Sequence, residues 1–159
     1  MGTHIYNGIH VAIPDDVEPT DENLQALIDE AEAGDSSTSL EDLRFDKRQQ
    51  INAWRMREIA RGIDYDGNGY DTTEQSIINI NGAVTMAMLA QANSQSYSID
   101  WTLADNTTIA LDADGMIGLG VAVGTHVDAM YQAARAHKDA IKSLDEAALA
   151  SYDITAGWD

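Results

Sequence analysis

Residues 112–148 read DADGMIGLGVAVGTHVDAMYQAARAHKDAIKSLDEAA, and the spacing of their apolar side chains predicts one long helix. Asp112 is the expected N-cap of this helix. Along it, apolar or small residues and one histidine recur at intervals of four and three, as in the seam between packed helices. The seam consists of Val123, Val127, Met130, Ala134, His137, Ile141, Leu144 and Ala148. Glycines at 118, 120 and 124 weaken its first turns but let a neighbouring backbone approach closely.

Two further helices are expected before this one. The first covers residues 39–61, with a cap at Ser39, an acidic partner at Asp42 three residues later, and a stop signal at Gly62. The second covers about residues 71–92 and has apolar residues on nearly every face. A helix of that kind is predicted to be central and buried.

Two segments between the helices have the alternation and the turn residues of β-hairpins. They cover residues 63–71, around a glycine-rich turn, and residues 97–111, around Asp105-Asn106. The predicted fold is therefore α+β, with a three-helix core and one or two small β-hairpins, preceded by an acidic N-terminal arm.

Charge divides the chain near residue 40. Residues 1–43 contain no Lys or Arg, whereas residues 44–61 hold six of the nine basic residues. We therefore predict an acidic arm over 1–40 with a short strand and a short helix, a helical domain over 41–150, and a C-terminal tail over 151–159. Two interpretations of the arm stay open. It is either a solvated acidic surface or an electrostatic docking element that binds the basic helix or another subunit.

Composition excludes several classes of protein. The 159 residues include no cysteine, so disulfide scaffolds, thiolate zinc sites and cysteine nucleophiles are excluded. No apolar run is as long as a membrane span requires, and the first residues lack the pattern of a signal peptide, so a soluble, uncleaved chain is expected. The net charge of −18 disfavours binding to nucleic acid or to anionic membranes. Mimicry of DNA by acidic residues stays open on charge alone.

One local pattern indicates metal chemistry. Asp64, Asp66 and Asn68, followed by Gly69, match the first half of an EF-hand calcium loop. The position of the closing bidentate glutamate is occupied by Gln75, a poor substitute, so a plain hairpin turn is the favoured interpretation. The histidines lack the spacing of a metal pair, and no motif assigns a catalytic residue or a cofactor.

A set of scattered residues resembles a domain of unknown function that is widespread in bacteriophage tail-region proteins. The resemblance covers about residues 44–145 and rests on the order and spacing of Lys47, Arg48, Asn52, Arg55, Gly62, Ile63, Tyr65, Gly67, Tyr70, Asp71, Thr72, Ser76, Asn79, Ile80, Gly82, Ala83, Val84, Trp101, Asp105, Asn106, Val127, Tyr131, Lys138 and Ile141. It implies a protein encoded among tail-fibre, baseplate and fibre-assembly genes, located in the virion tail or, during assembly, in the host cytoplasm.

These observations predict a protein that acts through its surfaces and is not an enzyme. A structural component of the tail, baseplate or fibre region is the first hypothesis, a tail-fibre assembly chaperone the second, and a calcium-dependent binding module the third. The expected partners are other tail proteins or copies of the chain, in an oligomer, with no nucleic acid, membrane or cofactor. The predicted partner interface consists of Val123, Val127, Met130, Ile141, Leu144, Tyr152 and Trp158.

Overall fold

The computed structural model describes residues 2–6, 9–13, 18, 20–35 and 38–158, which fall into two compact units, Met1–Leu43 and Arg44–Asp159. In the first unit, β1 (Gly2–Tyr6) pairs antiparallel with β2 (Ile9–Ile13). The helix α1 (Asp21–Asp35) packs against β2. A small apolar cluster is buried there, in which Leu24 and Ile28 of α1 meet Ile13.

The helix α2 (Leu40–Ile59) begins with the predicted capping arrangement. The Ser39 hydroxyl accepts a hydrogen bond from the Asp42 backbone N–H at 3.1 Å, and the Ser39 N–H donates to the Asp42 carboxylate at 3.2 Å. These two bonds give hydrogen-bond acceptors to the N–H groups of Ser39 and Asp42, which the helix itself leaves without a partner.

The C-terminal end of α2 is held by residues that are distant in sequence. Gly62 stops the helix with a φ of +95°, a left-handed conformation that glycine adopts without strain. The Thr72 hydroxyl donates to the Ile59 carbonyl and accepts from the Gly62 N–H at 2.9 Å. The His126 Nε2 lies 3.2 Å from the carbonyl oxygens of both Glu58 and Ile59. These bonds satisfy the last carbonyls of α2 and join it to the two helices that follow.

The first predicted hairpin forms as β3 (Ile63–Tyr65) and β4 (Asn68–Tyr70), paired antiparallel. Its two turn residues, Asp66 and Gly67, have φ values of 49° and 76°. Positive φ at both central positions is the mark of a type I′ turn, whose twist matches that of the strands.

The helix α3 (Glu74–Ala92) follows, with Thr73 as its N-cap accepting from the Ser76 N–H at 3.2 Å. The second hairpin consists of β5 (Ser98–Thr102) and β6 (Thr108–Asp112), in a register that pairs Ser98 with Asp112 and Trp101 with Ile109. Asp112 then caps α4 (Ala113–Ala140), because its carboxylate accepts from the Gly115 N–H at 2.8 Å.

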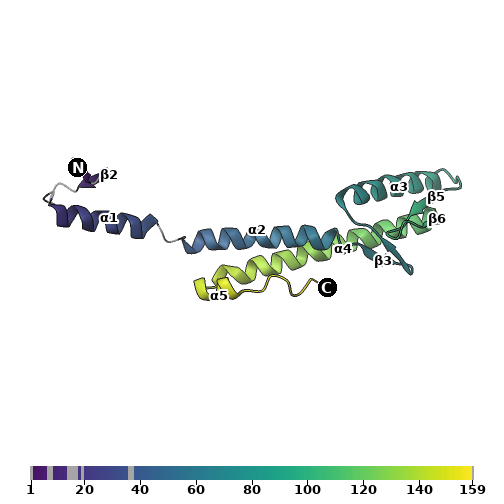
Figure 1. Cartoon of the computed structure of the whole chain (residues 1–159). Coiled ribbons are helices and arrows are strands. Elements are labelled where there is room, and N and C mark those ends of the chain that lie inside the picture. The colour runs from purple at the N-terminus through teal and green to yellow at the C-terminus, as the bar shows by residue number, and fades with distance from the viewer. Residues whose placement is uncertain (1, 7–8, 14–17, 19, 36–37, 159) are drawn as a thin grey trace. The chain divides into compact units, whose positions relative to one another are not determined.

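The three long helices of the second unit meet along α4 (Figure 1). α3 lies beside the N-terminal half of α4, and α2 lies beside the C-terminal half. The α+β class is thus confirmed, with two small antiparallel hairpins in this unit.

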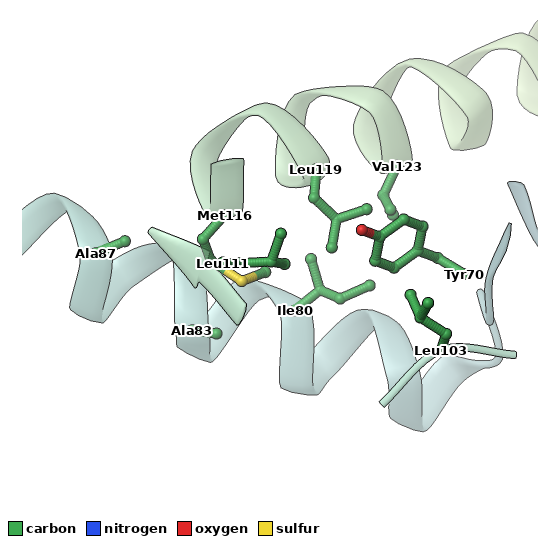
Figure 2. Close-up of a cluster of buried hydrophobic side chains, with 9 residues drawn as sticks. All are labelled: Tyr70, Ile80, Ala83, Ala87, Leu103, Leu111, Met116, Leu119 and Val123. Atoms are coloured by element: carbon green, nitrogen blue, oxygen red, sulfur yellow. The ribbon is translucent and has the colours of Figure 1, made fainter. Parts of the chain in front are cut away.

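The apolar core in Figure 2 lies between α3, the first turns of α4 and the two hairpins. Its fully or nearly fully buried side chains are Tyr70, Ile80, Ala83, Ala87, Leu103, Leu111, Met116, Leu119 and Val123. Two glycines of α4 allow the close packing around it. A Cβ at Gly118 would overlap the Tyr65 hydroxyl, and one at Gly120 would lie 2.6 Å from Cγ2 of Val84. A neighbouring backbone was expected to approach these glycines closely, but at Gly118 and Gly120 the close neighbours are the side chains of Tyr65 and Val84.

Two predictions about the helices are wrong. The long helix does not continue to residue 148. It ends at Ala140 and is followed by a 3₁₀ turn, η1 (Ile141–Ser143), and by a separate helix, α5 (Glu146–Ser151). The reason is local, because the Asp145 carboxylate accepts from the Ala148 N–H at 2.9 Å and so caps a new helix.

The second error concerns α3, which is not buried on all sides. Ile78, Met86, Met88 and Leu89 are each more than half exposed. The described residues cover only the side that faces α4 and the hairpins, because a single layer of neighbours can pack against only one face of a helix.

Candidate protein-contact surface

Most residues of the predicted partner interface belong to the interior of the chain itself. Val123, Met130, Ile141 and Trp158 are between 1% and 7% exposed. The other three, Val127, Leu144 and Tyr152, are half-buried. The four and three spacing on α4 therefore marks the surface that packs against the chain's own elements, and the four buried side chains cannot contact a partner in this structure.

The C-terminal residues are anchored on His137 of α4. Nε2 of His137 lies 2.8 Å from the carbonyl oxygen of Ala156 and must carry the proton, because a carbonyl can only accept. Nδ1 lies 2.8 Å from the Tyr152 hydroxyl. The indole of Trp158 covers the imidazole, and its N–H donates to the Ile154 carbonyl at 2.8 Å. This histidine therefore has a packing role, and both of its ring nitrogens are occupied.

Several basic residues of α2 are also engaged within the second unit. Arg44 donates to the Leu144 carbonyl at 3.0 Å, and Lys47 approaches the Tyr152 carbonyl at 3.5 Å. From α4, Lys138 donates to the Asn52 side chain at 2.6 Å. Burial, and secondarily the positive charge of Arg55, lower the pKa of Lys138 below its ordinary value. Arg44, Lys47 and Lys138 thus join α2 to α4 and to the residues that follow α4.

A groove of about 540 Å³ opens where α2, the start of α3 and α4 converge. Its apolar lining includes Met56, Ile78 and Val127, and Met56 is 62% exposed. At one edge the Arg55 guanidinium lies 4.2 Å from the centre of the Tyr131 ring, a cation–π contact. The groove combines an exposed apolar lining with one cation, Arg55, and one carboxylate, Glu74, which suits a side chain or segment of another protein.

The outer face of α3 continues this apolar surface away from the groove. Ile78, Met86 and Leu89 are 56%, 60% and 52% exposed. No Asp, Glu, Lys or Arg occurs between residues 75 and 99, although the chain carries a net charge of −18. A second groove, of about 520 Å³, runs beside α3 and is lined by Gly82, Met86, Tyr97, Ile99 and Trp101 among others. We call the outer side chains of α3 together with this groove the α3 face.

The α3 face was not predicted from the sequence, although two signals were present. A second set of residues, Ile78, Gly82, Thr85 and Leu89, recurs at intervals of four, three and four on the side opposite the buried stripe. The long interval without formal charge also coincides with this helix. The apolar residues on nearly every face of this helix predicted burial inside the chain, whereas exposed apolar surface of this kind is typical of binding sites for other proteins.

The candidate calcium loop takes the form of a tight hairpin. Asp64 lies on β3 opposite Gly69, and the Asn68 side-chain amide donates to the Asp66 carbonyl at 3.0 Å. Among the described residues, no group of three or more His, Cys, Asp or Glu side chains could hold a metal ion. None of the helices formed by these residues is long and apolar enough to cross a membrane.

The elements from α2 to α5 make up one α+β domain, in which two hairpins and α3 pack on a long central helix. Residues 42–156 match the family model of a domain of unknown function, DUF4376, and the chain belongs to this family. The matched span begins in the first turn of α2 and ends beyond α5, so it includes both grooves and the α3 face. No curated protein and no solved structure matches the chain.

Proposed function

We propose that this protein is a structural component of a bacteriophage tail, in the baseplate or fibre region, and that it works through protein–protein contacts without transforming a substrate. The link to phage tails comes from the residue pattern described above, which resembles that of tail-region proteins. The mode of action comes from the surface of the domain.

The α3 face is the observation that carries this proposal. A chain with a net charge of −18 keeps a 25-residue interval, 75–99, free of formal charge and exposes large apolar side chains from it. Exposed apolar side chains gain free energy when a partner removes them from water, at about 25 cal/mol per Å². The depletion of charge is the compositional feature that distinguishes the core of protein interfaces from the remaining surface.

Mass spectrometry of purified phage particles tests the proposal. The expected result is that the chain is present in a fixed ratio to the known tail proteins. Its absence from purified particles, together with its presence in the lysate of infected cells, would overturn the structural role and favour a fibre-assembly chaperone. Particles purified from a phage in which the gene carries an early stop codon serve as the control for contaminating host protein.

A further inference from the structure

The outward stripe of α3 has a symmetrical order of residues. Ile78, Gly82, Thr85 and Leu89 place a large residue at each end and a small residue at each of the two inner positions. Ile78 and Leu89 are exposed, and the Thr85 hydroxyl donates to the Asn81 carbonyl at 2.8 Å, so it is satisfied within its own helix. The order of side-chain sizes along the stripe, large, small, small and large, is therefore the same in both directions of the helix.

Gly82 has no packing explanation within one copy of the chain. Glycine lowers the stability of a helix interior, and helices retain it where something must approach closely. At Gly120 that neighbour is Val84, but apart from its chain neighbours and its own helix backbone, no atom of the described residues lies within 4 Å of a Cβ built on Gly82. Gly124 on α4 has equally open surroundings, but Gly82 lies on α3 between the exposed side chains of Ile78 and Leu89, where a second molecule has room to approach the helix backbone closely.

We propose that the α3 face binds the α3 face of a second copy, with the two helices antiparallel and a two-fold axis passing between Gly82 and Thr85. In this arrangement Ile78 lies opposite Leu89 of the second copy, and Gly82 lies opposite Thr85 of the second copy. A two-fold interface requires a surface that is complementary to itself, and the size order of the stripe meets this requirement. The inference rests on the proposed function, because it names the partner of the surface described there.

Charge repulsion between two copies is weakest at this face. Two chains that each carry a net charge of −18 repel one another wherever their acidic surfaces meet. The interval 75–99 carries no formal charge, so two copies can approach closely there without opposing carboxylates. The groove beside Gly82 and Met86, about 520 Å³ in volume, gives the large side chains of the second copy a place to pack.

Disulfide trapping tests both the contact and its direction. The natural chain contains no cysteine, so single-cysteine variants have no background reaction. We expect a mixture of Ile78→Cys and Leu89→Cys to form disulfide-linked dimers under mild oxidation. Each variant alone should form few, because antiparallel pairing places its two identical positions about 16 Å apart along the helix. Ser143→Cys, at an exposed site on η1, is the control for random collision.

Two outcomes of this experiment would overturn the proposal. Efficient cross-linking of each variant with itself would show that the helices pair in parallel. Cross-linking of the mixture no better than that of Ser143→Cys would show that the α3 face does not meet a second copy.

Light scattering on the full chain gives an independent measurement. The expected result is a dimer for the natural protein and a monomer for Gly82→Glu, which inserts a charge and a side chain at the centre of the contact. Gly124→Glu makes the same change at an exposed glycine of α4, outside the interval 75–99, and should leave the dimer intact. Circular dichroism checks that each variant retains its helices. A natural protein that is monomeric at tens of micromolar would refute the pairing.

The two proposals can fail separately. A monomeric chain that is nevertheless present in purified particles would remove the pairing and leave the structural role. A dimeric chain that is absent from particles would keep the pairing and overturn the structural role.

Discussion

The imidazole of His137 and the indole of Trp158 are stacked, with ring centroids 5.1 Å apart and ring planes inclined by 21°. Trp158 is 7% exposed, although it is the penultimate residue of the chain. The stack, together with the bond from His137 to the Ala156 carbonyl, fixes the residues after α5 against α4. The C-terminal segment is thus part of the folded domain.

Trp158→Ala should therefore destabilise the domain, and not only release its last residues. We expect a loss of about 3 kcal/mol in the free energy of unfolding, measured by urea denaturation, because a large buried side chain is removed. Trp158→Phe keeps an aromatic ring over His137 but loses the bond to the Ile154 carbonyl, so its loss should be smaller. Equal stability of the natural protein and Trp158→Ala would show that the segment does not contribute to the fold.

The glycines of α4 should respond to substitution with opposite signs. A Cβ at Gly118 overlaps the Tyr65 hydroxyl, so Gly118→Ala should destabilise the domain by about 1–3 kcal/mol. Apart from its chain neighbours and its own helix backbone, no described atom lies within 4 Å of a Cβ at Gly124, so Gly124→Ala should gain up to about 1 kcal/mol from helix propensity. Thermal and urea unfolding of both variants measure the difference.

A second-site change checks the cause of the Gly118 effect. Tyr65→Phe removes the hydroxyl that a Cβ at Gly118 would overlap, so it should recover part of the stability lost in Gly118→Ala. If the two changes are simply additive, the hydroxyl is not the source of the strain.

Local signals allowed much of this fold to be predicted from the sequence. The Asp66-Gly67 turn, the Asp112 cap and the Ser39–Asp42 capping arrangement each depend on residues within a few positions of one another, and each forms as expected. The end of α4 was not predicted, because the apolar spacing continues through Ile141 and Leu144 while a cap at Asp145 interrupts the helix. Spacing shows which residues face inward but not whether the helix that carries them is continuous.

The candidate surface was harder to predict for a different reason. An apolar residue such as Leu89 satisfies the same pattern whether its partner is another part of the chain or another molecule. The number of neighbours that α3 has is a property of the tertiary arrangement, and no local signal reports it. Conversely, Val123 and Met130 were expected to contact a partner, and the structure buries both of them within the domain.

The turn between β5 and β6 should contribute stability that depends on pH. Hydrogen bonds from the Thr107 side chain and backbone N–H lower the pKa of Asp105 below its ordinary value of 3.8. A carboxyl with a depressed pKa in the folded state stabilises the fold above pH 3.8, and this contribution is lost as the pH falls through the folded-state pKa. Asp105→Asn should therefore be less stable than the natural protein at pH 7, with the difference disappearing in acid.

Urea unfolding of both proteins at a series of pH values from 7 to about 2.5 tests this. The other carboxylates titrate in both proteins, so their contribution cancels in the difference between the two free energies of unfolding. Thr107→Val removes the hydroxyl donor and should reduce the same pH-dependent difference. A gap between natural protein and Asp105→Asn that is constant over the whole range would show that the carboxylate does not act through its charge.

Two valines of α4 provide a matched test of which side of this helix is inside. Val127 is half-buried and lines the groove between α2, α3 and α4, whereas Val121 is 65% exposed. Val127→Asp places a carboxylate in an apolar lining and should lower the free energy of unfolding by about 2 kcal/mol. Val121→Asp makes the same chemical change on the same helix in water, so its effect should be limited to the small loss of helix propensity. Equal destabilisation by the two changes, measured by urea unfolding, would contradict the orientation of α4 and with it the placement of the groove.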